Sequence, residues 1–137
     1  MNNELQKLHH RLIKDIKKLQ LPTDFTLDLR GYSKTYNGRY MIKDKKIVIY
    51  PYMDSTEKQL LSYNYIFKTL LHELVHHYQY VYQTDFVRYH GVAHSPQFYN
   101  ILDKWEQRAY EQGVLTVNWK QEYSFIGGST TNAYKDN

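Results

Sequence analysis

The sequence predicts a single α+β domain in which a small β-sheet packs against helices. Apolar residues recur every three or four positions in three separate stretches, whereas residues 25–50 contain short runs that alternate apolar and polar side chains. With 137 residues, 42% of them hydrophobic, the chain is long enough for one core and too short for two ordinary domains. We therefore expect one domain over residues 1–126 and a polar, flexible tail over residues 127–137.

Composition excludes several classes of protein. Cysteine is absent, which rules out disulfides, cysteine-ligated zinc and thiol catalysis. No apolar run is long enough to span a membrane, and the charged N-terminus lacks the apolar core of a signal peptide. Aromatic residues make up 16% of the chain, which argues against disorder. We expect a cytoplasmic protein without a membrane partner.

The net charge of +4 is unevenly distributed. Residues 1–46 contain 11 Lys or Arg against 5 Asp or Glu, a balance of +6, whereas residues 47–137 contain 7 against 9, a balance of −2. This basic N-terminal part could associate with DNA or with another acidic surface. A solvated helix face followed by a lysine-rich turn accounts equally for the charge, and we favour that interpretation.

The N-terminal elements follow from periodicity. Residues 3–20 are expected to form an amphipathic helix that ends before Pro22. One stripe of this helix is apolar: Leu5, Leu8, Leu12, Ile16 and Leu19. The alternation around Phe25, Leu27 and Leu29 predicts a half-buried strand.

A hairpin and a second strand are expected next. Asn37-Gly38 lies between tyrosine-rich runs and is a strong signal for a hairpin turn. Residues 46–50 form an apolar run that Pro51 ends, and a polar turn connects it to residues 40–42.

Two further helices carry start signals. Asp54 and Glu57 have the spacing of a capping box, which predicts a helical region to about Tyr82, with a break near residues 62–64 left open. A loop should cover residues 84–94.

The last helix should begin at Ser95-Pro96, with serine as N-cap and proline in the first turn. Phe98, Ile101, Leu102, Trp105 and Ala109 would form its apolar face, and Gly113 fits the position just after its end. Residues 114–126 alternate loosely and are expected to form another strand.

The most informative segment is His72-Glu73-Leu74-Val75-His76, an HExxH pattern within a predicted helix. Residues four apart share one face of a helix, so His72 and His76 can bind the same metal ion. Glu73 lies about 100° around the helix, where it can flank the metal and accept a proton from water. Two surface histidines beside a solvated glutamate remain the structural alternative.

A catalytic zinc site needs a third protein ligand. His94 directly precedes the predicted helix start and is therefore anchored on a rigid element, so we prefer it to His90, which lies in the loop. His77 points about 100° away from His76 and is expected at the edge of the core or behind the site. His9 and His10 are expected to be ordinary surface residues.

With these motifs in place, the chain resembles the SprT-like zinc metallopeptidases, the family that includes bacterial SprT and the protease domain of Spartan. Their HExxH helix is matched by residues 72–76. Their His-Gly-Pro-Glu-Phe-like motif is matched by residues 94–98, with Ser95 for glycine and Gln97 for glutamate. The strand-rich segment that precedes the HExxH helix is similar to residues 25–50, and the resemblance spans about residues 5–112.

The resemblance implies a zincin-like fold and a zinc-dependent endopeptidase acting on a protein or peptide substrate. One Zn²⁺ ion would be bound by His72, His76 and His94, with Glu73 as general base. Arg88, Tyr89 and His90 are candidates for stabilising the oxyanion or contacting substrate, His90 also being the alternative third ligand. Tyr99 is expected to serve packing.

Several alternatives stay open at this point. Manganese, nickel or cobalt can also occupy a three-histidine site. A metal-stabilised, non-catalytic module that binds DNA or a protein is the alternative from another functional class. A peptidase dedicated to one regulatory protein, as in HExxH proteins resembling the ImmA family, is the third. Residues 78–82 are rich in tyrosine and could stack on single-stranded bases, although we favour wall and core roles.

Overall fold

The computed structural model describes residues 2–83 and 94–116. Over these residues the chain forms a small α+β structure with three α-helices and a three-stranded mixed sheet. The elements are α1 (Asn3–Lys18), β1 (Thr26–Leu29), β2 (Gly38–Met41), the 3₁₀ turn η1 (Ile42–Asp44), β3 (Lys46–Ile49), α2 (Tyr63–Tyr82) and α4 (Pro96–Glu111). The expected tail, residues 127–137, lies outside the described part of the chain.

Helix α1 forms as its periodicity predicts. The Asn2 side chain caps it by accepting a hydrogen bond from the Leu5 backbone N–H at 2.8 Å. The whole predicted apolar stripe is buried, which confirms the predicted face. The helix ends at Lys18, two residues earlier than expected, and Gln20 then adopts a positive φ of 57°.

The sheet has the order β1-β3-β2, because β3 lies between the two strands that precede it in sequence. Strand β1 runs parallel to β3, and β2 runs antiparallel to β3. The hairpin therefore turns through η1, where Lys45 adopts a left-handed conformation with φ of 48°. This turn is the polar connection predicted between residues 40–42 and 46–50.

The hairpin predicted at Asn37-Gly38 is wrong. Gly38 is the first residue of β2, its φ is not positive, and no described strand lies directly before it. The Asn37 side-chain amide instead donates to the Tyr65 hydroxyl at 2.8 Å, and the Asn37 backbone carbonyl accepts from the Tyr50 N–H at 2.9 Å. These tertiary contacts take the place of a local turn.

The helix start predicted at Asp54 is also wrong. Asp54 accepts from the backbone N–H of Thr56 within a tight turn, and Glu57 has a positive φ of 54°. The Glu57 carboxylate accepts a hydrogen bond from the Tyr32 N–H at 2.8 Å, on a different segment. Helix α2 begins at Tyr63, where Ser62 accepts from the Tyr65 N–H.

Helix α4 begins and ends as predicted. The Ser95 hydroxyl accepts from the Phe98 N–H at 3.2 Å, Pro96 is the first helical residue, and Gly113 follows the end with φ of 77°. Four of the five predicted apolar residues are buried, and Ile101 is half-buried. The strand expected over residues 114–126 is absent from 114–116, and the rest lies outside the described residues.

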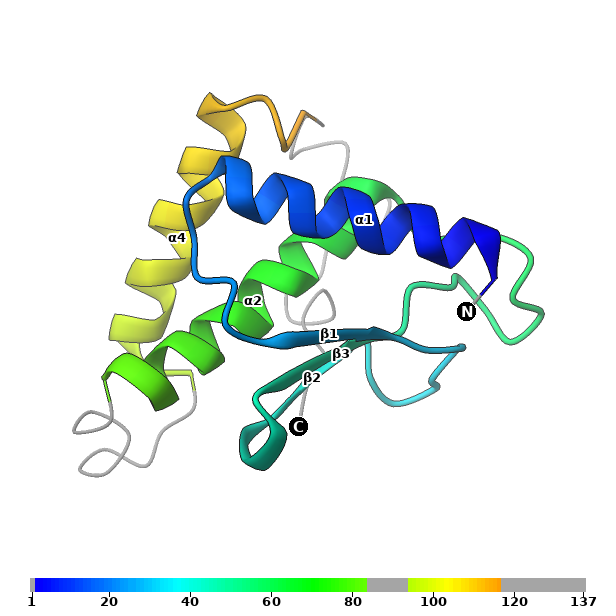
Figure 1. The fold of residues 1–137 in the computed structure, drawn as a ribbon, viewed down its shortest axis with the longest axis horizontal. Helices are drawn as coiled ribbons and strands as arrows, with labels where there is room; N and C mark the ends of the chain where they lie inside the picture. Colours follow the sequence, from blue (N-terminus) through cyan, green and yellow to red (C-terminus); the bar gives the residue numbers. More distant parts are fainter. Residues whose placement is uncertain (1, 84–93, 117–137) are drawn as a thin grey trace.

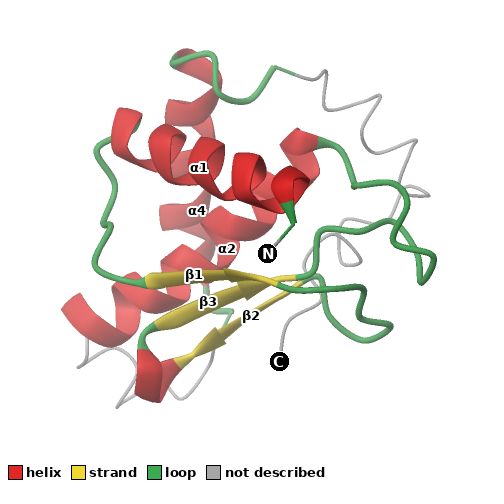
Figure 2. Cartoon of the chain, turned by 45° about the vertical axis from the view of Figure 1, so that its right-hand side comes forward, coloured by secondary structure: helices red, strands yellow, loops and turns green. Residues whose placement is uncertain are grey.

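The helices cover one face of the sheet (Figure 1; Figure 2). Helices α1 and α2 lie on the same side of the sheet, where α1 contacts β1 and α2 packs against α4, β2 and β3. Its central position explains why 14 of its 20 residues are buried, polar ones included. The HExxH segment therefore lies in the middle of the domain.

Candidate metal centre

The structure brings together the three histidines that the sequence predicts as metal ligands. His72 and His76 lie one turn apart on α2, and His94 directly precedes the N-cap of α4. The Nε2 atom of His94 lies 3.1 Å from the Nε2 atoms of both His72 and His76. His72 and His76 are 1% and 6% exposed, and His94 is partly exposed, so the cluster opens to solvent on the His94 side.

Phe98 supports all three imidazoles. Its ring centroid lies 4.8 Å from that of His72, 4.7 Å from that of His76 and 5.1 Å from that of His94. The phenylalanine itself is fully buried. The sequence predicts Phe98 on the apolar face of its helix. Only the folded structure shows that the Phe98 ring packs against all three histidines.

Glu73 is buried beside the edge of the sheet. Glu73 is 1% exposed, and its side chain packs against Gly38 at the start of β2. A methyl group on Gly38 would lie 3.2 Å from Glu73 Cγ and 2.7 Å from Thr69 Cγ2. Glycine at this position is therefore required by close packing of the strand on α2, and not by a turn.

The donor set fits a divalent cation. Zinc–nitrogen bonds of about 2.0–2.1 Å in tetrahedral geometry separate two ligand nitrogens by about 3.3 Å, close to the observed 3.1 Å. A proton on His94 Nε2 can bridge to one neighbouring nitrogen at a time, whereas a metal ion accepts all three lone pairs together. A cation would also offset the cost of burying the Glu73 carboxylate. The three histidines are therefore positioned to bind a metal ion.

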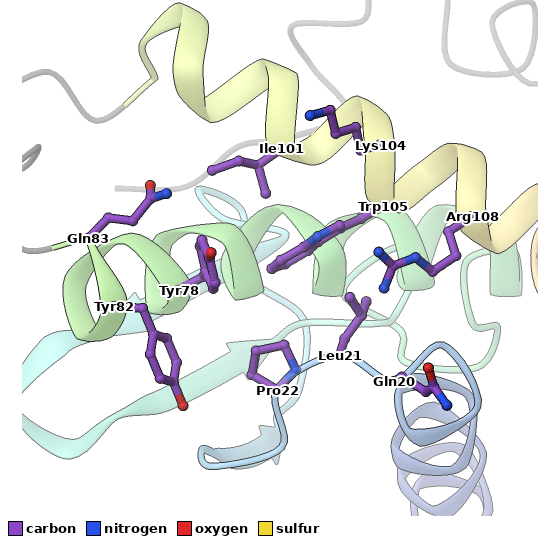
Figure 3. Close-up of a pocket in the computed structure, with 10 residues that line it drawn as sticks. All are labelled: Gln20, Leu21, Pro22, Tyr78, Tyr82, Gln83, Ile101, Lys104, Trp105 and Arg108. Carbon is purple, nitrogen blue, oxygen red and sulfur yellow. The ribbon is translucent and has the colours of Figure 1, made fainter.

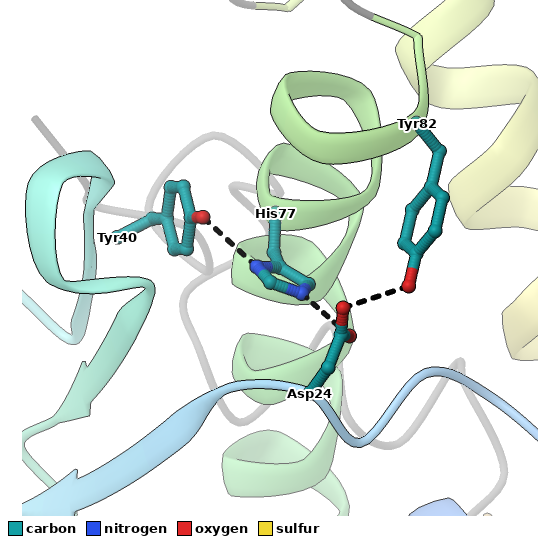
Figure 4. Close-up of polar contacts among 4 residues, drawn as sticks. All are labelled: Asp24, Tyr40, His77 and Tyr82. Carbon is teal, nitrogen blue, oxygen red and sulfur yellow. Dashed lines mark hydrogen bonds and ion pairs between the residues drawn. The ribbon is translucent and has the colours of Figure 1, made fainter.

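His77, which follows His76 on α2, belongs to a different cluster of polar side chains (Figure 4). It is fully buried, its Nε2 lies 2.9 Å from Asp24 Oδ1, and its Nδ1 lies 2.8 Å from the Tyr40 hydroxyl. The second Asp24 oxygen accepts from the Tyr82 hydroxyl at 2.7 Å. The sequence predicts His77 at the edge of the core or behind the site, but no signal in it identifies Asp24, Tyr40 or Tyr82 as neighbours of His77.

The electrostatics of this cluster agree with its hydrogen bonds. The hydrogen bond from His77 and then that from Tyr82 lower the pKa of Asp24, so its carboxylate stays ionised. Burial, followed by the charge of Asp24, raises the pKa of Tyr40 to about 12, so its hydroxyl remains protonated. A carboxylate only accepts, so His77 Nε2 carries a proton; in the neutral ring Nδ1 then accepts from Tyr40.

The other residues singled out in the sequence are the loop residues 88–90, the two N-terminal histidines and Tyr99. Arg88, Tyr89 and His90 lie outside the described residues. His10 is exposed as expected, whereas His9 is only half-exposed and its Nε2 lies 2.9 Å from the Leu27 carbonyl, which ties α1 to β1. Tyr99 is 45% exposed, and its ring centroid is 6.3 Å from that of His94, so it borders the cluster and is not confined to the core.

A separate groove of about 670 Å³ lies between the end of α2, the middle of α4 and the loop after α1 (Figure 3). Tyr78 and Trp105 contact each other edge to face in this groove, and Tyr82, Lys104 and Arg108 also line it. None of the three clustered histidines lines it. The tyrosines after the HExxH motif thus serve partly as groove walls, the role that we favoured for them from the sequence.

Comparison with known proteins found no matching family model, curated protein or solved structure. Among the described residues, no helix is both long and apolar enough to cross a bilayer. The function is therefore inferred from the residues of this chain.

Proposed function

We propose that this protein is a zinc-dependent metallopeptidase, a hydrolase with a zincin-like, SprT-like domain. The observation that carries the proposal is the convergence of three histidine Nε2 atoms beside a buried glutamate that follows the first of them in sequence. A purely structural metal site needs ligands but has no use for an adjacent general base. The partly exposed His94 side leaves an approach for a polypeptide substrate.

Each residue has a defined task in this proposal. His72, His76 and His94 hold the zinc ion through Nε2. Zinc supplies a Lewis acid that polarises the scissile carbonyl and lowers the pKa of water. Glu73 accepts a proton from the attacking water and delivers it to the leaving amine. The backbone of β2 packs so closely against Glu73 that no side chain would fit at Gly38. This close packing keeps the buried Glu73 side chain in one place.

The decisive experiment compares the wild type with Glu73→Gln. We expect both to bind one equivalent of zinc, because Glu73 is not a ligand. Hydrolysis of fluorescently labelled casein should fall about 100- to 10,000-fold in Glu73→Gln, since the general base is lost. Equal casein hydrolysis by the two proteins, or a wild type that binds zinc without hydrolysing casein or a broad peptide library, would contradict the proposal.

A binding module is the second candidate, and the groove is the observation that favours it. Lys17 and Lys18 are exposed at the end of α1. Lys104 and Arg108 line a groove whose walls also include three aromatic side chains, those of Tyr78, Tyr82 and Trp105. This combination suits single-stranded nucleic acid. Fluorescence anisotropy with a labelled oligonucleotide tests it: affinity should fall steeply with salt and also in a Lys104→Glu, Arg108→Glu variant. Salt-independent binding would exclude this interface.

A further inference from the structure

We propose that Asp24, His77 and Tyr40 form a clamp that positions Glu73, and that these three are positioning residues for the reaction. This inference rests on the proposed function, since it assigns Glu73 the role of general base. The observation behind it is a buried histidine with both ring nitrogens in hydrogen bonds, on the same helix face as Glu73.

Helix and strand periodicities place the clamp directly beside Glu73. Glu73 and His77 are four residues apart on α2, so they occupy one face of the helix. Gly38 and Tyr40 are two residues apart on β2, so they share one face of the strand. The pairs match across the interface: Gly38 packs against Glu73, and Tyr40 bonds to His77.

These two contacts determine how α2 rests on the edge strand. The Gly38 contact sets how closely the backbone of β2 approaches Glu73, but packing alone permits the helix to slide or roll. The hydrogen bond between Tyr40 and His77 is directional and fixes the helix one turn further on. The Tyr40 ring also stacks on Tyr80, with centroids 6.1 Å apart, which holds the hydroxyl in place.

Asp24 completes the clamp from the other side. Asp24 precedes β1, and its carboxylate lies 2.9 Å from His77 Nε2. His77 is therefore held between β2, which carries Tyr40, and the segment that leads into β1 (Figure 4). A carboxylate partner of this kind fixes the tautomer and orientation of a histidine ring. The Phe25 ring meets His77 edge to face at 5.8 Å and restricts it further. The metal-facing side of α2 carries none of these contacts.

The clamp predicts a specific pattern of effects. Variants that remove a clamp contact should still bind one equivalent of cobalt with near wild-type affinity, because they leave all three metal-binding histidines, His72, His76 and His94, in place. Their kcat should fall about 10- to 100-fold with little change in KM, because a general base displaced by about 1 Å transfers protons poorly. The cobalt absorption spectrum should shift toward that of Glu73→Gln, which marks a site without its carboxylate.

The test uses Tyr40→Phe and Asp24→Ala in the full chain, with two controls. Tyr82→Phe removes the outer hydroxyl while leaving the Asp24–His77 contact, and Leu8→Ala destabilises α1 outside the clamp. Asp24→Asn, which keeps an acceptor for His77, should recover most of the activity lost in Asp24→Ala. Thermal melting, cobalt spectra and casein hydrolysis are measured for every variant.

The outcomes separate the two proposals. Loss of kcat and a shifted spectrum in the clamp variants, but not in Leu8→Ala or Tyr82→Phe, support the clamp. Lower melting temperatures with wild-type spectra and kcat would show that the three residues serve stability alone and would overturn it. A wild type that is inert toward casein overturns the proposed function, and a wild type that binds no cobalt overturns both.

Discussion

His76 and His77 are neighbours on one helix, yet their surroundings differ completely. The Nε2 atom of His76 faces the Nε2 atom of His94, and the two nitrogens are close enough to bind the same metal ion. His77 has an acidic partner at Nε2 and a hydroxyl partner at Nδ1. The 100° rotation between adjacent helix positions turns one ring toward α4 and the other toward the sheet. The same residue type thus belongs to a cluster positioned to bind a metal ion in one case and to a hydrogen-bonded cluster against the sheet in the other.

The largest effect should come from breaking the ligand side of this comparison. His76→Ala should weaken zinc affinity more than about 100-fold, because loss of a ligand exceeds the effects known for supporting residues. Stability of the metal-free protein should fall less than it does in His77→Ala, whose ring has a hydrogen-bond partner at each nitrogen. Isothermal titration with zinc and urea unfolding in EDTA measure the two quantities. Retention of wild-type zinc affinity would remove His76 from the ligand set.

His77→Ala should show the opposite behaviour. Substitution removes a fully buried side chain with two hydrogen bonds, so we expect a loss of about 2–4 kcal/mol in unfolding free energy, with or without metal. Urea unfolding in EDTA measures it directly beside His76→Ala. If His77→Ala proved as stable as wild type in EDTA, the contrast between the two histidines would fail.

Gly38→Ala tests how closely β2 approaches the face that Glu73 and His77 share. The added methyl group would lie 2.7 Å from Thr69 Cγ2, so unfolding free energy should fall by about 1–3 kcal/mol. Thr69→Ser removes that methyl group and keeps the hydroxyl that donates to the Tyr65 carbonyl. The double variant should therefore recover part of the loss. Additive losses would show that this contact is not the constraint.

The smallest effect concerns pH. The pKa of Asp24 is lowered by its hydrogen bonds from His77 and Tyr82, so its contribution to stability is present above the unfolded pKa near 3.8 and is lost as pH falls through the lower folded value. Because the side chain is 45% exposed, we expect less than about 1 kcal/mol. Wild type should exceed Asp24→Asn in urea midpoint at pH 7, and this difference should shrink progressively as the pH falls below 3.8. A constant difference would contradict this assignment.

Signals confined to one helix were the reliable ones. The stripe of α1, the Ser95-Pro96 start of α4 and Gly113 after its end are all found where the sequence predicts them. Each depends on residues within a few positions of one another. The spacing of His72 and His76 is of the same kind, since a single helix places both on one face.

Local signals failed where a distant segment competes for the same residue. Asn37-Gly38 has the composition of a turn, but Asn37 bonds to the Tyr65 hydroxyl and Gly38 packs closely against α2. Glu57 has the spacing of a capping box, but it bonds to the backbone of Tyr32, 25 residues earlier. Neither competitor is visible within a short window of sequence.

By itself, the sequence determined α1 and α4 with their apolar faces and the HExxH pair, because each follows from short-range periodicity and capping. Tertiary structure decided that β3 lies between β1 and β2, that His94 meets His72 and His76, and that Phe98 supports all three rings. It also decided that His77 bonds to Asp24 and Tyr40. The contacts of His94 and Phe98 with the HExxH histidines, and those of His77 with Asp24 and Tyr40, join residues that are 18 or more positions apart in the chain. Only burial of a common core brings such residues together.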